Sequence, residues 1–249
     1  YSTKKLPVFA ENVVASSQHL AATAGLRMLA KGGNAVDAAI ASAIAITVVE
    51  PTMNGIGADA FCILWDGTKL VGLNASGQSP ALMTPDKYEG QAKISDTGWG
   101  CVSVPGAVSL WTTLHGRYGK LPFADLFEPA IKYAHDGFRV SYMVARQWDR
   151  AIARLKGQQD WVRNFLPNGR APLPGEVWKF PDQARTLAKI AETKGEAFYR
   201  GEIAEAIAHV LRDGGHRALA LPARDVRSLE GWDAVVLGSA VYAAFWQKD

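Results

Sequence analysis

The sequence predicts a helix-rich α+β fold, and three observations support that prediction. Residues 35–49 form an Ala-rich apolar stretch, with glycines before it and Pro51 after it. Two short apolar runs at 61–65 and 69–73 flank an Asp-Gly pair, which is a signal of an antiparallel hairpin with a tight turn. Later segments repeat apolar residues every three or four positions, as amphipathic helices do.

The first helix is expected to begin after Ser16 or Ser17, because either hydroxyl suits an N-cap. Apolar side chains then recur every four residues over 20–28, which places them on one face. Gly32 and Gly33 favour the left-handed conformation that ends a helix. The sequence therefore predicts a helix that stops just before residue 32.

The second helix is predicted over 35–49. Asn34 is suited to cap it, and Asp37 falls in its first turn, where a negative charge faces the positive end of the helix dipole. The stretch is apolar almost all round, so closely packed neighbours are expected on every side. Gly55 and Gly57 then turn the chain into the first strand.

The later elements follow from proline, glycine and periodicity signals. Thr84, Pro85 and Asp86 open a short helix, and Pro122 suits the first position of another. Longer helices are expected at about 107–118, 126–134, 141–166 and 181–193. The first of them follows the Pro105-Gly106 turn. Residues 166–175 have the composition of a loop, for which an ordered connector is favoured over a substrate lid.

Composition narrows the classes of function. The chain has 249 residues, 48% hydrophobic content and a net charge of +3 spread along its length, which predicts a solvated surface and no nucleic-acid partner. Five histidines without ligand spacing argue against a metal site. Cys62 fits a core position, and the sequence does not decide whether Cys62 forms a disulfide with Cys101. The apolar runs are too short for a membrane span, and without a leader the cytoplasm is the expected location.

Four blocks, in this order, resemble the gamma-glutamyltranspeptidase family. They lie at residues 32–61, 104–108, 121–138 and 195–202, and the first carries the family's GGNAxDAA segment before a glycine turn. The resemblance covers roughly residues 8–208. It implies a partial αββα sandwich of the N-terminal-nucleophile hydrolase type, helix-rich, with sheets shared between two subunits.

The resemblance also implies a chemistry. In the family a precursor cleaves itself, and the freed N-terminal Thr of the small subunit attacks a γ-glutamyl or related amide, with its own α-amino group as base. The stretch 112–115 is superficially similar to the family's Thr-Thr-His block, but it falls in a predicted helix. We therefore expect no catalytic nucleophile here: the chain would be a truncated large subunit, inactive without a small-subunit partner chain or a missing C-terminal half.

Two residues are predicted to face the small-molecule amide substrate. The family's large subunit offers an Arg four residues before the proline of an Ala-Pro pair, where it binds the substrate's α-carboxylate. Counting back from Pro80 places Ser76 at that position, and Gln78 is the nearest long polar side chain. Neither is charged, so the chain resembles a divergent amidase or acylase branch. An alternative interpretation of equal weight is that residues 76–80 form only the turn that follows the second strand and have no role in substrate binding.

The C-terminal tail suggests a different family. Residues 229–242, with an apolar run before Gly238 and Ser239, resemble a flavodoxin-like strand and its ligand loop. Accordingly the predicted domains are 1–208, the large-subunit region, and 209–249, an incomplete flavodoxin-like or divergent tail. The sequence lacks the phosphate loop that flavodoxins use for FMN, so no cofactor is expected.

Two alternative functions follow from these observations. The first is a flavodoxin-like electron-transfer module, and the second is a non-catalytic fragment that binds a partner chain through an exposed apolar face. For the tail itself, a junction between two families is favoured over natural divergence and over chance.

Overall fold

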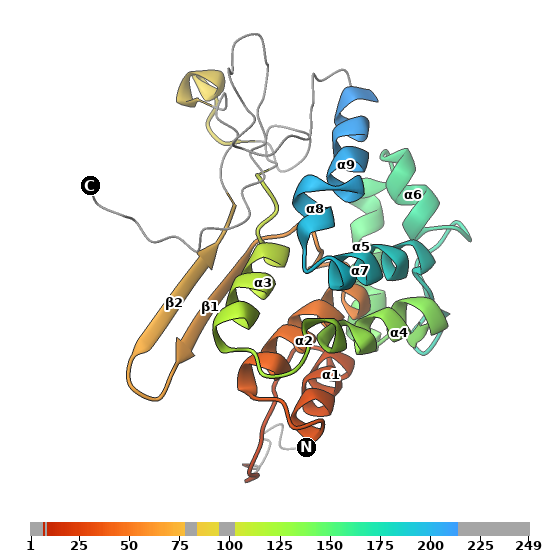
Figure 1. Cartoon of the computed structure of the whole chain (residues 1–249). Coiled ribbons are helices and arrows are strands. Elements are labelled where there is room, and N and C mark those ends of the chain that lie inside the picture. Colours follow the sequence, from red (N-terminus) through yellow and green to blue (C-terminus); the bar gives the residue numbers. More distant parts are fainter. Residues whose placement is uncertain (1–6, 8, 78–83, 95–102, 214–249) are drawn as a thin grey trace.

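The computed structural model describes residues 7, 9–77, 84–94 and 103–213, and helices dominate it (Figure 1). Two antiparallel strand pairs accompany them, β1 with β2 and β3 with β4. The helices are α1 (His19–Ala30), α2 (Ala35–Val49), η1 (Pro85–Tyr88), α3 (Ala107–Tyr118), η3 (Phe123–Phe127), α4 (Glu128–Asp136), α5 (Tyr142–Leu155), α6 (Gln159–Phe165), α7 (Pro181–Glu192), α8 (Glu196–Arg200) and α9 (Glu202–Asp213). The strands are β1 (Ala60–Trp65), β2 (Leu70–Ala75), β3 (Phe138–Arg139) and β4 (Val177–Trp178). The α+β, helix-rich prediction is confirmed for this part of the chain.

Helices α1 and α2 form an antiparallel pair, and hydrogen bonds cap both the end of α1 and the start of α2. Gly32 has φ 87°, Gly32 N–H donates to Leu29 O (2.9 Å) and Gly33 N–H donates to Met28 O (2.9 Å), which is the hydrogen-bond pattern of a Schellman motif. Asn34 then caps α2 in a capping box with Asp37. The predicted cap by Asn34 is confirmed, and of the two glycines predicted to adopt the left-handed conformation, Gly32 does and Gly33 does not.

The predicted cap of α1 was wrong by one or two residues. Gln18 occupies the N-cap position, and its side-chain oxygen accepts from the backbone N–H groups of Leu20 and Ala21. Ser17 instead donates its hydroxyl to the Glu50 carboxylate, with 2.9 Å between Oγ and Oε2. The longer amide side chain reaches the first turn, while the serine ties the entry segment to the end of α2.

Asp37 joins two segments that lie more than eighty residues apart. Its carboxylate is fully buried and accepts from the backbone N–H groups of Asn34 (3.0 Å), Lys120 (3.0 Å to one oxygen, 3.2 Å to the other) and Leu121 (3.2 Å). A buried carboxylate is tolerated only when its oxygens are well hydrogen-bonded, and here backbone donors supply those bonds. Asp37 thus fixes the α1–α2 turn against the loop between α3 and η3.

Helix α2 is apolar almost all round and was predicted to be buried on every side, but neighbouring residues cover it less completely than that. Ten of its residues are buried, and seven of them belong to the hydrophobic core that α2 shares with α1, α3 and α4. Ala35 and Ala39 are exposed, however, and Ser42, Ala43 and Ile46 are only half-buried. One side of this apolar helix therefore lacks a tightly packed neighbour within the described residues.

The predicted hairpin is confirmed, with slightly different bounds. β1 pairs with β2 from Ala60↔Ala75 to Trp65↔Leu70, so the connection is a four-residue turn. Asp66 closes that turn because it accepts from Lys69 N–H, the Thr68 hydroxyl and Thr68 N–H, which together lower its pKa to about 2.

The two faces of the hairpin differ. Cys62, Leu64 and Leu73 face the core beside α3. The opposite face carries large apolar side chains that are exposed, namely Phe61 (66%), Ile63 (78%), Trp65 (63%) and Leu70 (68%). We call these four residues the outer hairpin face. Hydrophobic groups of this size are normally covered in a mature assembly.

The remaining helices follow the predicted periodicity with two corrections. Pro122 is the N-cap residue of η3 and not its first helical residue. The residues predicted to share a face of the helix over 126–134 (Leu126, Ala130 and Ala134) are fully buried, and Gly137 ends α4. Residues 141–166 are two helices, α5 and α6, rather than one. The break falls at 156–158 and includes Gly157, a residue that weakens a helix interior.

Two broader expectations concern architecture. The described residues contain two separate two-stranded ladders, so the implied αββα sandwich stays a prediction. Within the described ranges, no helix has the length and apolar content needed to cross a lipid bilayer.

Replacing Asp37 tests whether its carboxylate holds the helix pair to the α3–η3 loop. We expect Asp37→Asn to lower the free energy of unfolding by about 2–4 kcal/mol, because an amide nitrogen would face a backbone donor in a buried site. Urea unfolding followed by circular dichroism measures the change. Asp160→Asn is the control: Asp160 is 80% exposed in an ion pair with Arg163, so the change should stay below about 0.5 kcal/mol. Equal effects would contradict the role given to Asp37.

Candidate functional site

Three segments meet at the end of the hairpin that carries Ser76. They are the glycine turn before β1, the residues that follow β2, and the segment that precedes α3. Ala58 O accepts from Gly106 N–H (3.1 Å) and Ala107 N–H (2.9 Å), which ties the first segment to the third. The Ser103 hydroxyl donates to Ser76 O (3.4 Å), which ties the third to the second.

Two glycines allow the backbones to approach unusually closely at this junction. A Cβ at Gly106 would lie 1.8 Å from Ala75 O, and one at Gly77 would lie 1.8 Å from Val104 O. Gly77 also has φ 76°, a conformation that other residues rarely adopt. We call these contacts the glycine junction. It fixes the position of Ser76, which lies between Ala75 and Gly77.

Of the two residues predicted to face the substrate, the structure describes Ser76 but not Gln78. Ser76 is half-buried, and its backbone N–H donates to Asn74 Oδ1 (2.9 Å). Gln78 lies outside the described residues, so the structure gives no position for it relative to Ser76. The role of both in substrate binding stays a prediction.

Tyr199, a residue of α8, makes hydrogen bonds to the backbone next to the glycine junction, although α8 is distant from the junction in the sequence. Its hydroxyl donates to Pro105 O (2.7 Å) and accepts from Ser109 N–H (3.1 Å). Burial raises the pKa of this phenol, so it stays protonated at neutral pH. The sequence block at 195–202 carried no predicted role for this tyrosine, because both of its partners lie at least ninety residues earlier in the chain.

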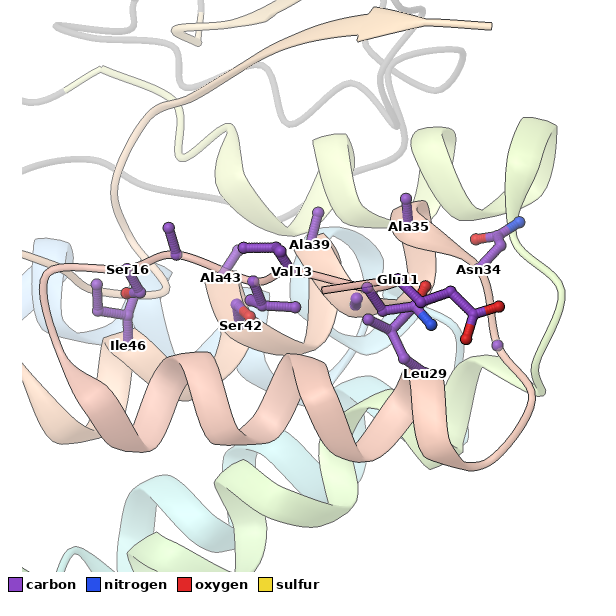
Figure 2. Close-up of a pocket in the computed structure, with 15 residues that line it drawn as sticks. Glu11, Val13, Ser16, Leu29, Asn34, Ala35, Ala39, Ser42, Ala43 and Ile46 are labelled. Carbon is purple, nitrogen blue, oxygen red and sulfur yellow. The ribbon is translucent and has the colours of Figure 1, made fainter. Parts of the chain in front are cut away.

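A groove lies along α2 (Figure 2). It has a volume of about 640 Å³ and runs between residues 11–16 and the incompletely covered side of α2. Ala39, Ala43 and Val13 lie along it, while Glu11 and Asn34 lie at one end (Figure 2). These side chains do not form a nucleophile and base, so the groove is better explained as an uncovered packing surface.

Candidate nucleophiles elsewhere in the described chain lack the required setting. Thr112 lies inside α3, with its hydroxyl donating to Ser109 O (3.0 Å), and the His115 ring bonds Leu121 O (2.8 Å). Burial raises the pKa of the Cys62 thiol, which opposes formation of a reactive thiolate. Among the described residues, no group of three His, Cys, Asp or Glu side chains is placed to hold a metal ion.

Comparison with known proteins identifies the family. A model of the gamma-glutamyltranspeptidase family matches residues 21–228. The chain therefore belongs to the gamma-glutamyltranspeptidase family. It is 38% identical to the glutathione hydrolase-like YwrD proenzyme of Bacillus subtilis over 208 residues, which cover 82% of this chain and 40% of that protein. It is 35% identical to the oxamate amidohydrolase proenzyme of Klebsiella pneumoniae over 225 residues, covering 86% and 41%.

The structural comparison agrees with the sequence comparison. The cephalosporin acylase of Bacillus halodurans matches with a TM-score of 0.76 at 43% identity, over 86% of this chain and 43% of the acylase. The chain thus spans about two fifths of the length of these three relatives.

The predicted flavodoxin-like tail is not supported by these comparisons. The family match continues to residue 228, past the boundary predicted at 208. Most of the tail, residues 214–249, lies outside the described residues, so the division into 1–208 and 209–249 stays a prediction.

Replacing Gly106 tests the close contact at the glycine junction. Gly106 has φ −100°, so an alanine there adds a steric clash with Ala75 O without backbone strain. We expect Gly106→Ala to lower stability by about 1–3 kcal/mol in thermal unfolding. Gly72→Ala, in the same hairpin, is the control, because no heavy atom lies within 4 Å of its added Cβ. A loss of stability in the control as large as in Gly106→Ala would argue against the contact.

Proposed function

We propose that this chain is the large-subunit region of an amide hydrolase or acyl transferase, acting with a region that supplies the nucleophile. Membership of the gamma-glutamyltranspeptidase family over residues 21–228 is the observation that supports it. The names of two relatives, an amidohydrolase and an acylase, point to the same bond type. The share of those relatives that the chain spans leaves room for a separate catalytic region.

The substrate-facing residues in this proposal are Ser76 and Gln78. Ser76 stands where the family resemblance implies an arginine that binds the α-carboxylate of a γ-glutamyl group. A hydroxyl there offers hydrogen bonds without positive charge, so an acyl group without that carboxylate is the better fit. The glycine junction supports this role because it holds the Ser76 backbone in one position.

The outer hairpin face is the surface on which we place the partner region. Phe61, Ile63, Trp65 and Leu70 are exposed, and in the described residues β1 and β2 pair only with each other. A two-stranded hairpin with an uncovered apolar face is marginally stable alone, and a second sheet packed on it would bury these side chains. The uncovered side of α2 is a second surface of the same kind.

Substrate choice tests the assignment of Ser76. In a form of the protein that contains the nucleophile, we expect an uncharged acyl anilide to be hydrolysed in preference to a γ-glutamyl anilide. Ser76→Arg should then lower the KM for the γ-glutamyl anilide about tenfold, because it restores a charge-assisted pair. The control is Ala153→Arg, which adds the same charge at an exposed position on α5. A wild-type preference for the γ-glutamyl anilide would contradict the assignment.

Charge placed on the outer hairpin face tests the docking surface. Ile63→Asp should weaken association with the nucleophile-bearing region at least about tenfold, since it puts a carboxylate into an apolar interface. Size-exclusion chromatography and calorimetry measure association. Lys69→Asp, in the adjacent turn, is the control for charge alone. If Ile63→Asp leaves association unchanged and the chain remains folded, the partner docks elsewhere.

A further inference from the structure

The Tyr199 hydroxyl occupies a position that a helix-capping side chain would normally fill. Helix α3 begins at Ala107, and Ser109 is its third residue. The N–H of the third residue is among those that lack a partner within the helix and that an N-cap side chain usually satisfies. Here Tyr199, 9% exposed and ninety residues away, accepts from that N–H at 3.1 Å.

The glycine junction explains why the cap comes from a distant residue. The N-cap position of α3 is Gly106, which has no side chain to offer. A larger residue is excluded there because its Cβ would lie 1.8 Å from Ala75 O. The close approach of β2 and the local capping of α3 are therefore mutually exclusive at this residue.

Tyr199 is held in place independently of the bonds it makes to α3. The start of α8 packs against α3 at Gly195, where an added Cβ would lie 2.9 Å from a Thr112 methyl carbon. The Thr193 hydroxyl accepts from Ala197 N–H (3.1 Å) and so caps α8 itself. The tyrosine ring also meets Phe198 edge-on, with 5.0 Å between ring centroids.

We propose that Tyr199 is a positioning residue for the substrate-facing end of β2. Its hydroxyl caps α3 in place of Gly106 and, by donating to Pro105 O, fixes the backbone against which Ala75 and Gly77 rest. The position of Ser76 then depends on a contact from α8. The substrate part of this statement rests on the proposed function, while the geometric part does not.

The order of contacts makes the proposal specific. Tyr199 holds Pro105, and the next residue, Gly106, donates to Ala58 O and touches Ala75 O. A loss of the hydroxyl should therefore loosen the amides of Gly106 and Ala107 as well as that of Ser109. A tyrosine that acted only as a cap would affect Ser109 alone.

Tyr199→Phe in the 249-residue chain tests the geometric part by amide hydrogen exchange. We expect exchange at Ser109, Gly106 and Ala107 to become about five- to tenfold faster, as the loss of one or two hydrogen bonds predicts. Tyr133→Phe is the matched control, because Tyr133 is 8% exposed and its hydroxyl donates to Leu20 O (3.4 Å) away from the junction. Faster exchange at Ser109 alone, or equal changes in both variants, would overturn the proposal.

Kinetics in a form of the protein that contains the nucleophile test the substrate part. Tyr199→Phe should raise the KM for the preferred amide several-fold more than it lowers kcat, and Tyr133→Phe should leave both unchanged. Faster exchange with an unchanged KM would overturn the link between Ser76 and substrate, and with it that part of the proposed function. A changed KM without faster exchange would overturn the positioning role instead.

Discussion

The buried carboxylate of Asp37 is the interaction on which the arrangement of the helices depends. Its side chain accepts hydrogen bonds from backbone N–H groups of the α1–α2 turn and of the α3–η3 loop. These two segments therefore cannot separate without leaving buried polar groups unpaired. Helix α2 also lies against α3 and η3, so Asp37 joins the start of α2 to the loop between two elements that α2 contacts. This gives the GGNAVDAA segment a structural meaning: the asparagine starts the helix, and the aspartate attaches it to the rest of the fold.

The elements with local signals were predicted well from the sequence. The bounds of α2 and α3 agree with prediction, because a cap, a proline or a glycine marks each end within a few residues of the helix it limits. The hairpin was found for the same reason, since Asp66 makes its turn bonds to residues two and three positions away. The break between α5 and α6 was missed although Gly157 was a visible signal, because the periodicity on both sides is similar.

The site was harder to predict because its contacts are long-range. The sequence placed Ser76 in the segment that follows the second strand, and in the structure Ser76 directly follows β2, but the sequence did not place it against the segment before α3. Nothing near Gly106 in the sequence indicates that it excludes a Cβ because of Ala75, and the partners of the Tyr199 hydroxyl, Pro105 and Ser109, are distant in the sequence. Contacts of this kind become visible only when the segments are placed in space.

The outer hairpin face has a consequence for how a protein of this kind is made. Among the described residues the hairpin pairs with no further strand, and its four exposed apolar side chains would promote aggregation if this region and the proposed partner region were synthesised as separate chains at low concentration. A covalent connection between the halves raises the effective concentration of the correct partner to the millimolar range. With the proposed docking, translation as one polypeptide would let the partner region reach the hairpin before another molecule does.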